Sequence, residues 1–466
     1  MSQARFLSSQ ADWSRPPEAP VAFAMRASRR SVAGAALSPL LAACGVTAGQ
    51  EGKRSAIQGP VSITILTRAG PFGHTGWYKD VTPRVFEKQR PNVKVEWDEA
   101  TGSGVTVAQK LLTLASGGTL PDVSWVNAVG DGGHGGITKG IFQPLDPLMK
   151  ADKFDRGPYW KAGLDVMSHK GQLFGLPTHG HYGASIMYVN LQLTKASGIS
   201  VPLADAAWTT DQLIDMARRV TRPDKGEWGF WPGTAIGQEG VMWLRTFGAD
   251  FLSADGKRCL LDTAEAQAAL TWLWGTQHQV QVIDNLRASD GSTKRFEEGK
   301  LAFMNQTPGL VAEWKKPGQE RVKHELGITV VPRHPQTGKR GTQVNAPAMG
   351  LCRDAKQPAA GWEWIKFITN RDNGVDQVQG GAGSPGARHD VWTDERLHKF
   401  DPVYRLIERV YREPGPVHLP HNGTWFEATD VVGRTLNQLW EGKMSVREAA
   451  QEATRQTQAI LDRGPS

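Results

Sequence analysis

The sequence predicts an α/β fold built on a parallel β-sheet. Apolar residues alternate with other residues at 61–67 and again at 93–97, as in strands that bury one face. A segment with helical spacing follows each of these strands, and a third strand is expected at 122–129, which gives the order βαβαβ. Without residues 1–43 the chain is still long enough for two or three domains with large cores.

Residues 1–43 are predicted to be a signal region and are left out of the fold. Within residues 25–43, three arginines precede an uncharged run rich in Ala and Leu that is too short to span a membrane. SRRSV at 28–32 looks like a twin-arginine signal, and the general secretory route stays open. Acidic residues in 1–24 do not fit a signal, so we expect the biological start at Met25.

The signal ends in LAAC at 41–44, which resembles a bacterial lipobox. That resemblance implies that Cys44 becomes the new N-terminus, because its thiol supplies the nucleophile for the thioether to lipid. Residues 44–59 are Gly-rich and polar and are predicted to form a flexible tether. The protein is therefore expected to be exported and lipid-anchored to the membrane, at the cell surface or in the periplasm.

The remaining elements follow from spacing and capping signals. Residues 171–190 are rich in strand signals, whereas 326–332 is predicted to be a buried strand. Capping boxes are expected at Thr209 with Gln212 and at Ser445 with Glu448. The predicted helices cover residues 77–90, stopped by Pro91, then 105–118, 208–221, 261–277 (opened by Asp262 with Glu265), 357–370 and 445–462.

Composition excludes several classes of function. The net charge is +7, but no dense Lys/Arg block with interleaved aromatic residues exists, so no nucleic-acid partner is expected. Cys259 and Cys352 either pair or are buried singly, and no Cys/His cluster has zinc spacing. The 17 tryptophans outnumber the 6 tyrosines, and a rigid indole face suits the apolar face of a sugar ring as well as it fills a core.

Eight segments in order resemble the extracellular solute-binding proteins of ABC importers, in the group that contains maltose-binding protein. The segments are FEKQRPNVKVEW, KLLTLASGGTLPDVSWV, GIFQPLDPLM, GQLFGLPTHGHYGASIMYVNLQL, WTTDQLIDMARRVT, FEEGKLAFMNQ, ITVVPRHPQTGKRGT and GWEWIKFITN. The resemblance implies a two-lobed periplasmic-binding-protein fold of the class II type, with a hinge that the chain crosses several times. It also implies a monomer that closes over a small solute, with a sugar expected, and that is read by ABC permease subunits with a separate ATPase.

The resemblance also divides the chain. It implies that residues 60–180 and 331–378 form lobe 1, and that 181–330 and 379–466 form lobe 2. The hinge crossings are expected near residues 177–182, near 329–331 and just after the helix that ends in WEWIKFITN.

The ligand is expected beyond the carboxyl ends of the strands, where loops carry aromatic and hydrogen-bonding side chains. Stacking faces, amides and guanidinium groups together suit vicinal hydroxyl groups. The predicted ligand-binding residues are Arg68, Trp77, Trp125, Asn127, His179, His181, Tyr182, Trp231, Trp243, Asn305, Asn345, Arg388 and Trp425.

Other functions are weighed against this one. A non-sugar solute such as a polyol phosphate or peptide would use Arg68 and Arg388 as anion partners. GDGGHG at 130–135 fits G-x-G-x-x-G, but no long helix is expected behind it to hold a pyrophosphate. His179 and His181 lack further ligands at metal spacing, so neither a metal nor a cofactor is expected. No catalytic residues are predicted; an exported carbohydrate-active enzyme would need two positioned carboxyl groups.

Overall fold

The structure is a computed structural model that describes most of the chain after the predicted tether. The described residues are 57, 59–69, 73–101, 104–127, 133–180, 186–236, 239–287, 291–316, 318–344, 346–411 and 424–464. The predicted signal region, Cys44 and most of the tether lie outside them. The predictions on those segments therefore stay predictions.

A five-stranded sheet, which we call the lobe 1 sheet, has the order β2-β1-β3-β11-β6. Its strands are β1 (Val61–Arg68), β2 (Val93–Ala100), β3 (Val123–Val126), β6 (Leu176–Pro177) and β11 (Ala348–Leu351). β1 lies parallel to β2 and β3, which confirms the predicted βαβαβ order, whereas β11 runs antiparallel to β3 and β6. The carboxyl ends of β1, β2 and β3 consequently share one edge of the sheet.

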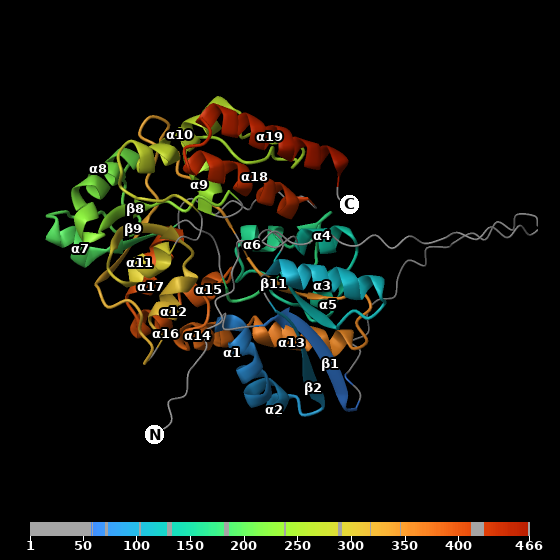
Figure 1. The fold of residues 1–466 in the computed structure, drawn as a ribbon. Helices are drawn as coiled ribbons and strands as arrows, with labels where there is room; N and C mark the ends of the chain where they lie inside the picture. Colours follow the sequence, from blue (N-terminus) through green and yellow to red (C-terminus); the bar gives the residue numbers. More distant parts are fainter. Residues whose placement is uncertain are drawn as a thin grey trace, which may run out of the picture. The chain divides into compact units, whose positions relative to one another are not determined.

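Helices pack against the strands of this sheet. α3 (Gly104–Ser116) packs on β1, β2 and β3, and α13 (Pro358–Ile368) packs on β1 and β11 (Figure 1). The short α4 (Gly133–Thr138) is all the helix that follows the G-x-G-x-x-G match, so the expected lack of a long helix there is confirmed. The remaining elements here are α1 (Gly73–Val81), α2 (Glu87–Gln89), α5 (Asp146–Ala151), α6 (Lys161–Asp165), β4 (Ser168–His169) and β5 (Gln172–Leu173).

The helix predicted over residues 77–90 is interrupted. α1 ends at Val81, a π-helical turn covers Thr82–Phe86, and α2 ends at Gln89, one residue before Arg90 and two before Pro91. Pro83 lies in that turn, and a proline has no N–H for the regular i→i−4 ladder. The predicted stop is confirmed, and the predicted helix runs on to Gln89, with its regular α-helical hydrogen bonding interrupted by this π-helical turn, which was not predicted.

A four-stranded sheet, the lobe 2 sheet, has the order β10-β7-β9-β8. Its strands are β7 (Ile186–Asn190), β8 (Trp228–Trp231), β9 (Leu301–Gln306) and β10 (Leu326–Val330). β8 lies parallel to β9, and β7 runs antiparallel to β9 and β10. All five residues of β7 are buried, as expected for a central strand with both faces covered.

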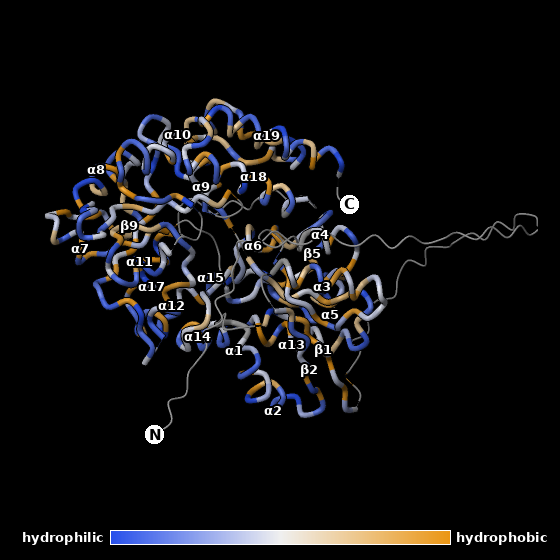
Figure 2. Tube along the Cα trace, viewed as in Figure 1, coloured by the Kyte–Doolittle hydropathy of each residue, from blue (hydrophilic) through white to orange (hydrophobic). Residues whose placement is uncertain are grey.

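Helices surround this second sheet. α8 (Thr210–Val220) packs on β8, and α17 (Val403–Tyr411) packs on β10. In Figure 2, α8 and α19 carry both hydrophilic and hydrophobic residues along their length, as amphipathic surface helices do. The other helices of this part are α7 (Leu191–Ala196), α9 (Glu239–Thr246), α10 (Ala264–His278), α11 (Ser292–Glu297), α12 (Gly309–Trp314), α18 (Trp425–Trp440) and α19 (Val446–Arg463).

The chain passes between the two sheets more than once. It leaves the lobe 1 sheet after β6 and enters the lobe 2 sheet at β7, and it returns between β10 and β11. Three more helices follow α13, and they are α14 (Arg371–Gln379), α15 (His389–Trp392) and α16 (Glu395–Phe400). The residue boundaries assigned to the lobes stay a prediction.

Capping explains where several helices begin. The predicted boxes at Thr209 with Gln212 and at Ser445 with Glu448 are both confirmed. The predicted opening of the helix at 261–277 was off by one residue. The side chain of Thr263, rather than Asp262, caps α10 and accepts from the backbone N–H of Ala266.

The structure decides whether the two remaining cysteines pair or are buried singly. Cys259 and Cys352 are both buried and free, so they act as small apolar core residues. Burial raises the pKa of both thiols, which keeps them protonated. Among the described residues, none of the helices combines the length and hydropathy needed to cross a bilayer.

Candidate functional site

Arg68 and Trp125 lie together at the carboxyl edge of the lobe 1 sheet. Arg68 is the last residue of β1, and its guanidinium carbon lies 5.9 Å from the centroid of the Trp125 ring on β3. Trp125 is 3% exposed, and its indole N–H has no hydrogen-bond partner among the described residues. Asn127, directly after β3, is also buried. Since buried donors are normally paired, the free N–H of Trp125 indicates a place for an external acceptor.

Thr67 and Trp77 extend this group. The hydroxyl group of Thr67, one residue before Arg68, is buried without a partner among the described residues, and no sequence signal marks it. Trp77 on α1 is half-buried, packs edge-on against Tyr78 with ring centroids 6.1 Å apart, and faces Gly380 after α14. Trp77 thus keeps part of its ring available, as a stacking residue requires.

A second group surrounds the end of β8 in the lobe 2 sheet. Trp231 is the last residue of β8 and is 5% exposed, and its indole N–H has no partner within the part of the chain that the structure describes. Asn305 on β9 donates its amide N–H to the carbonyl of Pro232 at 3.1 Å, but its side-chain oxygen is buried without a partner. One free donor and one free acceptor therefore lie on neighbouring parallel strands.

Glu239 joins this group through Gly233. A Cβ atom on Gly233 would come within 2.7 Å of the Glu239 Cβ and 3.3 Å of the Trp231 ring, and Gly233 has φ +70°. Only glycine satisfies both conditions here. No sequence signal around Glu239 indicates that this residue is buried.

Burial governs the ionisation of Glu239. The residue is 3% exposed at the first position of α9, and burial raises the pKa of its carboxyl group from 4.5 to about 7. No ion pair with Glu239 forms in the described part of the chain. The carboxyl group can therefore donate or accept a hydrogen bond near neutral pH.

Gln343 is a further residue that the sequence analysis missed. Its segment is held on α9, because Arg245 donates to the carbonyl of Thr342 at 2.8 Å and the N–H of Gly341 donates to Thr246 at 2.9 Å. The side-chain oxygen of Gln343 is buried and finds no partner in the described ranges. Only the three-dimensional path of the chain between β10 and β11 reveals this.

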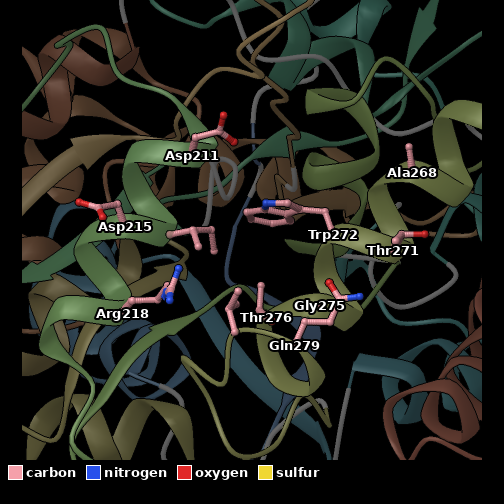
Figure 3. Close-up of a pocket in the computed structure, with 11 residues that line it drawn as sticks. Asp211, Asp215, Arg218, Ala268, Thr271, Trp272, Gly275, Thr276 and Gln279 are labelled. Atoms are coloured by element: carbon pink, nitrogen blue, oxygen red, sulfur yellow. The ribbon is translucent and has the colours of Figure 1, made fainter.

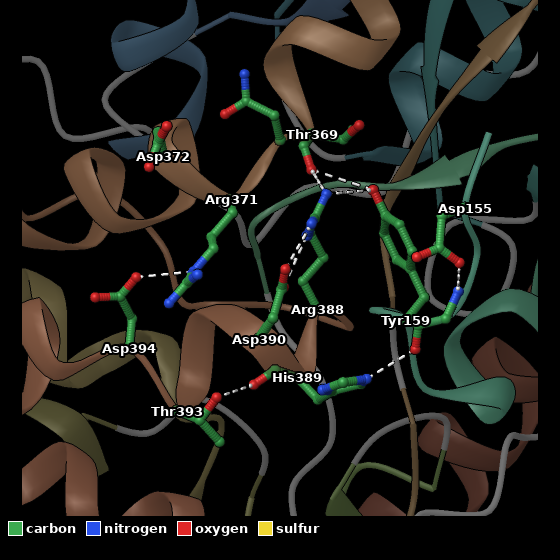
Figure 4. A network of polar contacts seen from close by, with 12 residues as sticks. Asp155, Tyr159, Thr369, Arg371, Asp372, Arg388, His389, Asp390, Thr393 and Asp394 are labelled. Atoms are coloured by element: carbon green, nitrogen blue, oxygen red, sulfur yellow. Dashed lines mark hydrogen bonds and ion pairs between the residues drawn. The ribbon is translucent and has the colours of Figure 1, made fainter. Parts of the chain in front are cut away.

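Arg388 is already paired with protein groups (Figure 4). Its guanidinium group donates to both carboxylate oxygens of Asp390, at 2.9 and 2.7 Å, and to the carbonyl of Thr369 at 3.1 Å. It also lies 5.0 Å from the centroid of the Tyr159 ring, whose hydroxyl group donates to the same carbonyl at 3.1 Å. The network joins the segment after α14 to that after α13, so the guanidinium of Arg388 is satisfied without a ligand.

His179 is enclosed at the end of β6. One ring nitrogen lies 2.8 Å from the carbonyl of Asn370 and the other 3.4 Å from that of Pro385. Burial, together with the charge of Arg388, lowers the pKa of His179 to about 4, so the ring is neutral. A Cβ atom on Gly374 would come within 2.5 Å of this ring, which shows how closely α14 approaches it.

Trp243 and Trp425 are both buried and pack against other aromatic side chains. Trp243 is fully buried and donates its indole N–H to the carbonyl of Pro232 at 2.7 Å. Trp425 packs edge-on against Phe251 with ring centroids 5.4 Å apart. His181, Tyr182 and Asn345 lie outside the described residues. The ligand-binding role of all of these stays a prediction.

Within the ranges that the structure describes, no group of three or more His, Cys, Asp or Glu side chains could hold a metal ion. What the two sheet edges share is a buried tryptophan with a free N–H, next to further unpaired polar atoms. Such groups suit a ligand that carries many hydroxyl groups.

Residues 73–375 match the family described as bacterial extracellular solute-binding protein. The chain belongs to that family. The resemblance stated from the sequence is thereby confirmed, and the protein is of the exported, solute-binding kind.

Two characterised relatives match over most of this solute-binding protein. The arabinooligosaccharide-binding protein of Bacillus subtilis is 21% identical over 422 residues, which cover 86% of this chain and 92% of the relative. The mannitol-binding protein of Pseudomonas aeruginosa is 26% identical over 416 residues, which cover 82% and 89%.

Solved structures show the same fold. An ABC substrate-binding protein of Listeria monocytogenes in complex with cycloalternan has a TM-score of 0.74 at 18% identity, covering 86% of this chain and 99% of its own. Maltose-bound MalE3 of T. maritima has a TM-score of 0.72 at 20% identity, with the same coverage. The predicted two-lobed α/β fold of periplasmic binding proteins is confirmed.

Proposed function

We propose that this solute-binding protein captures a sugar, a small oligosaccharide or a polyol between its lobes and delivers it to an ABC permease. The observation that carries the proposal is the pair of buried tryptophans, Trp125 and Trp231, at the carboxyl ends of strands in the two sheets. Each has an indole N–H without a partner. A hydroxyl-rich ligand would accept from both and would give donors to Asn305 and Gln343, whose free oxygens now lack them.

Closure supplies the transport signal. Contacts that the ligand makes with both lobes at once exist only in the closed form, so binding shifts the population towards that form. The permease subunits would read that form, and a separate ATPase would drive transport. The protein acts as a monomer, and its lipid on Cys44 would keep it at the membrane after export.

The polar groups favour a neutral ligand. Arg388 is held by both oxygens of Asp390 and is therefore a poor partner for a phosphate or a peptide carboxylate. The two relatives also favour a neutral ligand, since one is named for an arabinooligosaccharide and the other for mannitol.

The protein is proposed to bind its solute without chemical change. Glycosidases need two carboxyl groups beside the scissile bond. The other buried carboxyl groups in the described chain are those of Asp122 and Asp394. Asp122 accepts from the backbone N–H groups of Thr64 and Gln357, and Asp394 is paired with arginines, so neither serves as a partner for Glu239. A lone buried carboxyl group serves as a hydrogen-bonding group for hydroxyls.

A thermal-shift screen of the purified protein tests this proposal. Arabino-oligosaccharides, maltose and mannitol are the probes, with glucose 6-phosphate, peptides and amino acids as controls. A ligand at 100 times its Kd adds about 2.7 kcal/mol of stability, a rise of a few degrees in Tm. Stabilisation only by phosphates or peptides would contradict the neutral-ligand proposal.

Variants of Trp231 locate the binding site. Trp231→Phe keeps an aromatic ring but removes the N–H, and Trp231→Ala removes both. We expect Trp231→Ala to weaken sugar binding by about 30-fold or more, as for a buried aromatic contact. Trp274→Ala is the matched control, because that indole stacks on His278 at 4.7 Å, away from the strand ends. Unchanged affinity in both Trp231 variants would exclude the site at β8.

A further inference from the structure

A groove of 570 Å³ lies between α8 and α10, at a place where no ligand-binding residue was predicted (Figure 3). Asp211, Asp215 and Arg218 line it from α8, and Trp272 lines it from α10. Gln279, at the end of α10, closes one side. The volume is within the range of sites for small ligands.

The polar groups on the walls of the groove are free to bind a ligand. Asp211, Arg218 and Gln279 form no side-chain hydrogen bond or ion pair within the described residues. Asp215 lies only at the 4.0 Å limit of an ion pair with Arg219, which points out of the groove. Successive turns of α8 thus present two carboxylates and one guanidinium group along a single wall.

Trp272 gives the groove a fixed aromatic surface. The residue is partly exposed, and its ring packs at 4.8 Å against Trp243 and at 5.7 Å against Phe247. Figure 3 shows the indole reaching from α10 towards α8, with its nitrogen on the side of Asp211. Unlike the N–H of Trp243, which donates to Pro232, the N–H of Trp272 has no partner in the described chain. Packing holds the ring, so a ligand would pay little conformational entropy to stack on it.

We propose that the α8–α10 groove is a second carbohydrate site, separate from the proposed transport site, that binds one or two neutral sugar units. Aspartates, an arginine and an amide can each engage vicinal hydroxyl groups with two hydrogen bonds, beside an aromatic face. Two carboxylates against one guanidinium disfavour a phosphate or a carboxylate ligand. The site would hold one end of a longer glycan on lobe 2, and it does not depend on the proposed transport function.

Indole N–H signals in NMR spectra of the purified protein test this proposal. The probes are glucose, arabinose, mannitol and maltose, and the loss of one signal in Trp272→Phe identifies Trp272. We expect at least one probe to shift that signal in the wild type and equally in Trp231→Ala. The combined Asp211→Ala and Arg218→Ala variant should weaken this titration about tenfold, because it removes one carboxylate and the guanidinium group that line the groove. Arg219→Ala, beside the groove, is the control and should titrate as the wild type does.

Three results would overturn the second site. They are a Trp272 signal that no probe moves, a titration unchanged in the Asp211 and Arg218 variant, or a titration that disappears in Trp231→Ala. The last would mean that Trp272 reports the transport site through Trp243. If a probe still shifts the Trp272 signal but no probe shifts the Trp231 signal, the proposed transport site would be contradicted and the proposed second site would stand.

Discussion

Glu239→Gln is expected to stabilise the protein by an amount that grows with pH. Burial raises the pKa of Glu239 from 4.5 to about 7, which corresponds to about 3 kcal/mol of unfolding free energy. The folded state binds the proton more tightly than the unfolded state does. The neutral carboxyl group therefore contributes this stability fully below pH 4.5, and the contribution is lost as the pH rises through about 7. Glutamine stays neutral and keeps a similar shape.

The assay is the difference in Tm between Glu239→Gln and wild type, followed from about pH 5 to about pH 9. The difference should be small at the acidic end and reach roughly 4 °C at the alkaline end, given the entropy of unfolding of a chain of this length. Glu265→Gln is the control, because Glu265 is exposed near the start of α10, and its difference should not vary with pH. If the difference in Tm between Glu239→Gln and wild type did not change with pH, the claim that burial raises the pKa of Glu239 would be refuted.

Three further substitutions test other parts of the structure. Asp390→Ala leaves Arg388 without its carboxylate and should cost about 1–3 kcal/mol in a urea denaturation, whereas Asp390→Asn should cost less. Gly233→Ala forces a Cβ to within 2.7 Å of Glu239 at positive φ; a Tm equal to the wild type would show that this loop relaxes freely. Ser445→Ala removes the cap of α19 and should lower the free energy of unfolding by about 1 kcal/mol, with no change in sugar affinity.

Much of the fold could be predicted because local signals agree with it. Alternating apolar residues placed β1 and β2, and the side chains of Thr209 and Ser445 marked the first turns of α8 and α19. The π-helical turn at Pro83 was missed, since a helical stripe continues across it and hides the local break. Similarly, Thr263 and Asp262 both satisfy the capping preference, so sequence alone could not choose between them.

The site was only partly predictable, because burial and pairing depend on distant residues. Trp125 was selected at the end of a predicted strand and Trp231 in a predicted loop of the second lobe, but nothing local shows that their N–H groups lack partners among the described residues. Arg388 looked free for an anion, yet Asp390 two residues later satisfies it. The α8–α10 groove needs Asp211 and Trp272 side by side, and only the packing of the two helices brings them together.

The most direct test of the central claim is equilibrium dialysis of the purified protein against arabino-oligosaccharide, maltose and mannitol, with mass spectrometry of the solute recovered. We expect at least one of these solutes to be retained in proportion to the protein and to be recovered with an unchanged mass. Retention should fall in Trp231→Ala but not in Trp274→Ala. Recovery of shortened or otherwise altered sugar would contradict a binding protein and identify an enzyme. Retention of none of the three, with glucose 6-phosphate or peptides retained instead, would contradict the sugar and polyol assignment.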